Sequence, residues 1–309
     1  MSEAPRRATP ARSLVAEWRI PLALLALTFV STFWVGAAQE LFHRDVAIEA
    51  GLLAHFLAHP SHFLWGWTFA VPLMAILLSH ELGHYVAGRL HRVDVSPPYF
   101  IPLPVMLGTM GAVIRMRDRI ERRNALLDIG AAGPLAGMAV ALPVLVFGIW
   151  ESPVEALPEA SEGTTFFEGH NLLYAGLIYL LKGPLPEGHD IFLTPTAFAG
   201  WAGLLVTQIN LVPVGQLDGG HVAYALFGER QNRLGARIHR LLPLVGLGVS
   251  ALYVYRGWAA GERGDALLGE ALAGVHWVIW AGVLALLARL SGAAHPPTGP
   301  EPLTRGRRV

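Results

Sequence analysis

The chain lacks cysteine and is poor in charged residues. None of its 309 residues is Cys, which excludes disulfide bonds and thiolate metal ligands, so a metal must be held by His, Asp, Glu or water. Charged residues make up 15% of the chain, against roughly 25% in ordinary soluble proteins. The formal net charge is zero, which gives no indication of a nucleic-acid partner. Hydrophobic residues instead make up 53%, a composition typical of a protein embedded in a lipid bilayer.

The sequence contains several long apolar runs. A helix needs about 20 mostly apolar residues to cross a bilayer. Six runs approach that length, and they lie at residues 20–38, 63–90, 125–150, 192–211, 241–255 and 267–290. A further run at 171–181 is too short to span and predicts an interfacial or re-entrant helix. The sequence therefore predicts an all-α polytopic membrane protein with about six transmembrane helices.

The arginines indicate how the chain is oriented in the membrane. They gather at 6–19, 89–123, 230–240 and 305–308, whereas the segment 151–190 holds seven acidic residues and Lys182 as its one Lys or Arg. Six spans put all four Arg-rich segments on the same side, and short Arg-rich loops stay in the cytoplasm. We therefore expect a multi-pass protein of a prokaryotic cell membrane, with both termini cytoplasmic and 151–190 outside.

The second run contains the sequence His80-Glu81-Leu82-Gly83-His84. On a helix, His80 and His84 stand four residues apart and share one face, where both can ligate one zinc ion. Glu81 is then placed to act as general base on the attacking water. An amphipathic helix could carry this short pattern by chance. Ionisable side chains inside an apolar run are costly in lipid, however, and they indicate a functional site.

A zinc site needs a third protein ligand. Asp218 is one candidate, because it stands among glycines in a break of the apolar sequence, and a carboxylate at membrane depth needs a cationic partner. The alternative for Asp218 is to cap a helix that starts at Gly219. Asp128, in another apolar and Gly-rich stretch, competes as the ligand. His91 stands seven residues after His84, about 10 Å along a helix, which is too far for the same ion.

Two further segments are candidates for substrate binding. Four prolines forbid a helix in the segment 96–116. Gly108, Gly111 and the run 112–114 predict a turn and a short strand, with Gly111, Ala112 and Val113 as candidates for substrate binding. An exposed strand edge could bind an extended substrate by strand addition, whereas the alternative is an ordinary cytoplasmic loop. Asn210 could bind the substrate backbone or stabilise a developing oxyanion. Equally, its amide could satisfy a carbonyl that the nearby proline frees.

These pieces of sequence together resemble the site-2 proteases, the intramembrane zinc metalloproteases of peptidase family M50. The resemblance lies in the HExxH motif and in the segments 108–114, 128–137 and 210–221. It implies that Asp218 is the third ligand of a single zinc ion, and that a small membrane-embedded β-hairpin or re-entrant loop lies near the active site. We expect the protease domain at 20–290, between cytoplasmic tails at 1–19 and 291–309.

The resemblance implies an intramembrane zinc-dependent endopeptidase that acts in regulated intramembrane proteolysis. Its partners would be the lipid bilayer and a transmembrane protein substrate, cleaved within or near a membrane-spanning segment. Two other functions remain open, which are a catalytically silent membrane chaperone or scaffold of the same family and a metal transporter. The intact Glu81 argues against a silent member, and the few ionisable residues elsewhere in the predicted spans argue against a transport path.

Overall fold

The computed structural model describes residues 14–49, 51–117, 120–157, 168–169, 171–291, 298–299 and 301–307. Parts of the predicted tails and of the predicted external segment 151–190 lie outside the described residues. The chain folds into two compact units, one formed by 1–118 with 135–206 and the other by 119–134 with 207–309. Two of the three boundaries, at 134/135 and 206/207, fall within helices, so α5 and α7 each contribute to both units.

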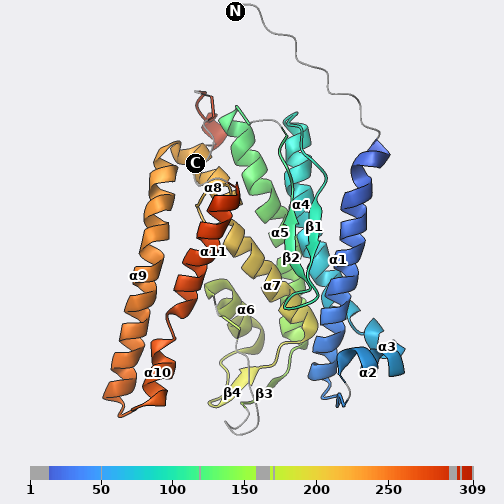
Figure 1. The fold of residues 1–309 in the computed structure, drawn as a ribbon, viewed down its shortest axis with the longest axis vertical. Coiled ribbons are helices and arrows are strands. Elements are labelled where there is room, and N and C mark those ends of the chain that lie inside the picture. The colour runs from blue at the N-terminus through green and yellow to red at the C-terminus, as the bar shows by residue number, and fades with distance from the viewer. Residues whose placement is uncertain are drawn as a thin grey trace, which may run out of the picture. The chain divides into compact units, whose positions relative to one another are not determined.

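The first unit combines long helices with two small antiparallel sheets (Figure 1). Its elements are α1 (Leu14–His43), α2 (Leu52–Ala58), α3 (Pro60–Leu64), α4 (Trp67–Leu90), β1 (Tyr99–Pro102), β2 (Thr109–Val113), most of α5 (Arg123–Glu151), β3 (Val154–Ala156), α6 (Leu172–Lys182), β4 (His189–Ile191) and the first part of α7 (Pro195–Asn210).

In its described residues, the second unit consists of helices and the segments that connect them, without a strand. It holds the start of α5, the end of α7, α8 (Asp218–Phe227), α9 (Arg230–Ala259), α10 (Asp265–Ala271), α11 (Val275–Ser291) and the short 3-10 helix η1 (Arg305–Arg307). The long helix α9 packs against both α10 and α11 (Figure 1).

Five stretches of described helix are long and apolar enough to cross a membrane, so the chain is an integral membrane protein of mostly helical fold. They lie at Ala16–His43, Pro60–Leu90, Arg123–Glu151, Arg230–Ala259 and Asp265–Leu286. Many large apolar side chains on these helices are exposed, as expected where a helix faces lipid. The predicted short helix at 171–181 is present as α6.

Three predicted spans differ in extent from the structure. The fourth, at 192–211, forms α7, whose 16 residues reach about 24 Å and fall short of a bilayer core of about 30 Å. The fifth is 30 residues long as α9, because the Arg-rich segment before it is helical too. The sixth is divided, since a turn at 272–274 separates α10 from α11.

The first unit is held together by close helix packing. One buried apolar cluster joins Phe69 and Leu73 of α4 to Phe100 of β1 and Ala199 of α7. The helices α5 and α7 approach closely at Gly200, where a side chain would overlap the backbone of Leu145. Small residues at helix contacts are the usual means of packing helices in lipid, where burial of apolar surface drives little association.

The predicted hairpin is present, formed by the antiparallel strands β1 and β2. β1 packs along α1, and the hairpin lies beside that helix in Figure 1. The turn between the strands depends on Gly108, which has a φ of +77° and lies against the backbone of Thr32. A side chain at Gly108 would meet both a disfavoured φ and the α1 backbone, so this glycine positions the hairpin.

Candidate metal centre

The HExxH motif lies in the second half of α4. His80, Glu81 and His84 are all buried, with 3%, 7% and 4% of their surface exposed. The Nε2 atoms of His80 and His84 are 3.2 Å apart. Two nitrogen ligands of a tetrahedral zinc, each at about 2.0–2.1 Å from the metal, stand about 3.3 Å apart. The paired imidazoles therefore have the separation that one zinc ion requires, and the predicted sharing of one helix face is confirmed.

A glycine of α5 leaves room for the first histidine. A Cβ placed on Gly137 would lie 3.1 Å from the Cβ of His80 and 3.2 Å from its Nδ1. That separation is tighter than ordinary contact, so α5 can approach His80 this closely only without a side chain at 137. The sequence contained Gly137 within the segment 128–137 but gave no reason for the glycine.

The hairpin lies next to the helix that carries the motif. β2 contacts α4, and Ala112 packs against the apolar cluster of the first unit. Gly111, Ala112 and Val113 all lie on β2, as predicted, rather than in an irregular loop. Within the described part of the chain this sheet has two strands, so β2 forms one of its edges. Val113 and Met110 on that strand are exposed by 55% and 70%.

In the second unit, the segment 211–217 joins α7 to α8. Asn210 is the last residue of α7, and Asp218 is the first residue of α8. Leu217 occupies the position before the helix, so Asp218 does not cap a helix that starts at Gly219. A side chain at Gly219 would overlap the backbone of Leu211. The start of α8 therefore rests directly on the backbone of the joining segment.

The first turn of α8 also packs on the start of α5. A Cβ on Gly130 would lie 2.9 Å from the Cβ of His221 and 3.3 Å from the backbone oxygen of Asp218. At the other end of α8, the guanidinium of Arg123 donates to the carbonyl oxygen of Ala225 at 3.0 and 2.7 Å. An arginine at this position satisfies carbonyls that a helix end leaves without partners. Both ends of α8 are thus fixed by α5.

Asp128, the competing carboxylate, is held by the C-terminal segment. Nε and Nη2 of Arg307 donate to its two oxygens at 2.8 and 2.7 Å. This partner raises the pKa of Arg307, mainly through the hydrogen bond. The side chain of Asn124 accepts from the backbone N–H of Thr304 at 3.1 Å. Asp128 and Asn124 therefore anchor residues 304–307 to α5, and no sequence signal pointed to Arg307.

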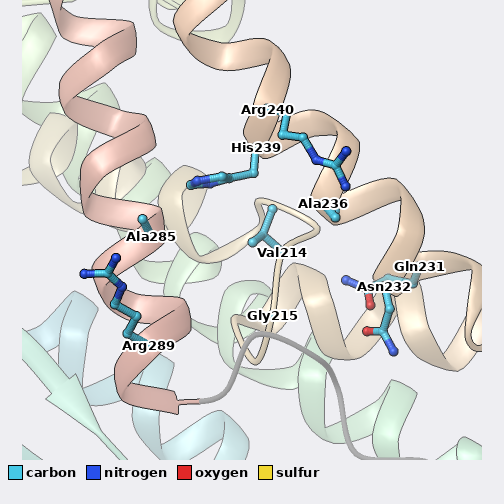
Figure 2. Close-up of a pocket in the computed structure, with 10 residues that line it drawn as sticks. Val214, Gly215, Gln231, Asn232, Ala236, His239, Arg240, Ala285 and Arg289 are labelled. Atoms are coloured by element: carbon cyan, nitrogen blue, oxygen red, sulfur yellow. The ribbon is translucent and has the colours of Figure 1, made fainter.

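A cavity of about 350 Å³ borders the segment that precedes Asp218. Figure 2 shows Val214 and Gly215 of that segment opposite side chains of α9 and α11. Gln231 of α9 is 1% exposed, and its Nε2 donates to the carbonyl oxygen of Pro213 at 3.1 Å. Gln231 therefore fixes the shape of the segment 211–217, a role that the sequence alone did not reveal.

Comparison with known proteins agrees with this geometry. The sequence pattern of peptidase family M50 matches residues 68–253 of this chain. This stretch includes the HExxH motif, the hairpin and Asp218. The chain belongs to peptidase family M50. The predicted resemblance to site-2 proteases is thereby confirmed.

Curated M50 relatives are plant proteins with zinc in their names. The probable zinc metalloprotease EGY2, chloroplastic, of Arabidopsis thaliana is 33% identical over 254 residues, which cover 81% of this chain and 42% of that protein. EGY1 of the same plant is 31% identical over 231 residues, covering 71% and 42%. EGY3 of rice (Oryza sativa) is 30% identical over 253 residues, covering 74% and 41%. The chain spans less than half the length of these relatives.

The side chains of the HExxH motif fit the zinc ion that was predicted for this M50 chain. Its relatives are zinc metalloproteases by name, and the imidazole pair on α4 fits that ion by donor type and by spacing. Imidazole and carboxylate are both zinc ligands, and in a chain without cysteine they are the protein ligand types that remain.

Proposed function

We propose that this M50 chain is an endopeptidase that cleaves membrane proteins within or near their transmembrane segments. The observation that carries the proposal is the buried arrangement of His80, Glu81 and His84 on α4, a helix long and apolar enough to cross a bilayer. A hydrolytic site on such a helix is accessible to substrates that lie in the same bilayer. The process we propose for it is regulated intramembrane proteolysis.

We propose His80, His84 and Asp218 as the protein ligands of one zinc ion. Asp128 is the weaker candidate, because Arg307 already binds both of its carboxylate oxygens. Gly137 packs against His80 in the first unit, and Gly130 packs against Asp218 in the second.

The chemistry is divided between the metal and the side chains. A zinc ion held by these side chains would supply Lewis-acid chemistry, lowering the pKa of the attacking water and polarising the scissile carbonyl. Glu81 takes the proton from this water and later gives it to the leaving amine. Asn210 supplies an amide to the substrate backbone or to the developing oxyanion. If Glu81 alone were neutralised, the motif would therefore lose its activity but would still bind zinc.

The edge of β2 is the proposed binding site for the substrate backbone. A transmembrane helix uses its own carbonyls in hydrogen bonds, so its peptide bonds are shielded until it unwinds. An unwound segment can pair with Gly111, Ala112 and Val113 as an added strand. The hairpin contacts α4, so a strand added there runs close to the helix that carries His80 and His84.

The test is cleavage of a labelled single-span substrate in proteoliposomes. Glu81→Gln should retain zinc but lose activity by about 100- to 10,000-fold, since the general base is lost while the imidazoles stay. His91→Ala is the control, because His91 follows the end of α4 and should leave zinc and activity unchanged. Cleavage by Glu81→Gln at nearly the wild-type rate would refute the role of Glu81. Zinc-loaded wild type without any cleavage would instead favour a silent scaffold or a transporter.

We also propose that the protease domain at 20–290 lies in a prokaryotic cell membrane with both flanking tails cytoplasmic. The Arg-rich segments support this orientation if the short α7 crosses the membrane as the fourth span, beside the five longer helices. Cys introduced at Glu155 and at Glu229 tests it, because both positions are exposed and the chain has no native Cys. A membrane-impermeant thiol reagent should label 155 and spare 229 in intact cells. The reverse pattern would invert the orientation.

A further inference from the structure

Three histidines gather near the start of α4, away from the HExxH motif. They are His55 in α2, His59 between α2 and α3, and His62 in α3. The Nε2 atom of His55 and the Nδ1 atom of His62 are 3.0 Å apart. The three ring centroids are separated by 5.1, 5.2 and 5.2 Å, so the rings form a nearly equilateral triangle.

The HExxH pair of the same chain provides a reference for these distances. His80 and His84 have ring centroids 4.9 Å apart and Nε2 atoms 3.2 Å apart. Imidazoles that share one tetrahedral zinc have centroids about 5 Å apart, as follows from a metal–nitrogen distance of about 2.0–2.1 Å. The ring centroids of the second histidine cluster are therefore spaced as in a metal site, although the three rings do not yet direct a nitrogen each at one point.

The orientation of the rings shows which side chain must move. His59 is stacked on His62 with an angle of 21° between the ring planes, so it presents its face rather than a nitrogen to its neighbour. His59 is exposed and stands at the junction of two short helices. Rotation about its side-chain bonds directs a nitrogen towards the other two rings without any change in the backbone.

The surroundings of the cluster are compatible with a cation. Arg44, the nearest basic side chain on the ring system, donates to Glu40 at 2.9 and 2.7 Å, which offsets its charge. Its guanidinium lies 4.5 Å from the centre of the Trp65 ring, and Trp65 in turn stacks on His62 at 4.1 Å. This stack covers one face of His62, while the side chain of His59 is exposed.

We propose that His55, His59 and His62 form a second metal site, which takes a divalent transition-metal ion such as zinc, nickel or copper. Imidazole ligands suit these ions rather than magnesium or calcium. A bound ion would join α2 to α3 just before the chain enters α4. The proposal does not depend on proteolysis, because it concerns ring geometry in a segment outside the HExxH motif.

The test counts zinc ions on the full chain in detergent. The protein is purified through an affinity tag without histidine, equilibrated by dialysis against zinc, and analysed for metal and protein. Wild type should bind two ions per chain, and the His55→Ala, His59→Ala, His62→Ala triple variant should bind one. His43→Ala is the matched control, since His43 is exposed at the end of α1, and it should still bind two.

The single variant His59→Ala makes the test independent of folding. Because His59 is exposed, its removal should leave the fold intact and weaken the second zinc at least about tenfold, measured by competition with a chromophoric chelator. Retention of the first zinc ion verifies that the variant is folded. The proposal is overturned if wild type binds one ion, or if the triple variant still binds two.

Discussion

His80 and His84 reach their positions by a different route from Asp218. The two histidines stand on a long regular helix, where a four-residue spacing alone places both rings on one face. Asp218 begins a ten-residue helix whose position depends on an irregular segment and on glycines. Gly219 lies on the backbone of Leu211, so even one added methyl group would meet main-chain atoms that cannot move aside.

This difference predicts where the site is sensitive to change. A helix face tolerates substitution around its functional side chains because its geometry is set by its own hydrogen bonds. A turn that depends on contacts between backbones tolerates substitution less well, because tightly packed main-chain atoms cannot move to make room. We expect the Asp218 side of the proposed site to be more fragile than the histidine side.

The largest effect should follow loss of the proposed third ligand. Asp218→Ala should release most of the bound zinc and lower activity by more than about 100-fold, because a two-histidine site cannot fill the tetrahedral coordination of zinc. Elemental analysis and the proteoliposome assay measure both quantities. Asp128→Ala should keep its zinc. If zinc is instead lost from Asp128→Ala and retained by Asp218→Ala, the assignment of the carboxylate is wrong.

Alanine at two glycines compares the two sides directly. Gly219→Ala should lower activity by about 10- to 100-fold, since forcing a methyl group into tightly packed atoms costs about 1–3 kcal/mol. Gly137→Ala should have a smaller effect, about two- to tenfold, because it presses on a side chain that can shift slightly. Gly176→Ala in α6, where a Cβ meets no atom within 4 Å, is the control. A stronger effect at Gly137 than at Gly219 would contradict the comparison.

The fixing of the segment 211–217 by Gln231 gives an intermediate case. Gln231→Leu keeps the side chain buried but removes the hydrogen bond to Pro213, which should cost about 1 kcal/mol. We expect activity to fall by several-fold while the zinc content is nearly preserved. Activity equal to that of wild type would show that the segment holds its shape without this contact.

The smallest effect is expected at the C-terminal segment. Arg307→Ala removes a partly exposed ion pair with Asp128, and such pairs contribute little to stability because solvent screens them. The melting temperature in detergent should therefore fall by no more than a few degrees, with zinc content unchanged. Loss of zinc from Arg307→Ala would mean that Asp128 serves the metal site after all.

The sequence could predict features that depend on residues close together in the chain. The histidine pair and the hairpin were predicted because helix spacing and proline content are local properties. The length of α9 was underestimated because hydropathy ended the span at 241, whereas arginine is a good helix former and extends the helix back to Arg230. The extent of α7 was overestimated because its apolar run begins at Phe192, three residues before the helix, and ends one residue after Asn210.

The contacts that the sequence did not predict are those between distant residues or between rings. Asp128 and Arg307 are 179 residues apart. Neither the composition nor the hydrophobic periodicity of the sequence indicates which arginine binds Asp128. The packing of Gly137 against His80 depends on the approach of two helices. The triangle formed by His55, His59 and His62 requires the break between α2 and α3, which sequence patterns did not indicate.

The pairing of Asp128 with Arg307 has a consequence for the order of synthesis. The ribosome makes Asp128, and with it α5, long before Arg307 exists, since 179 residues separate the two. During that interval the carboxylate at the start of α5 lacks its ion pair with Arg307. The final anchoring of α5 is therefore a late event, completed only after α8, α9 and α11 have been made. A translation pause before residue 307 would leave the protein with its helices assembled but with this anchor still missing.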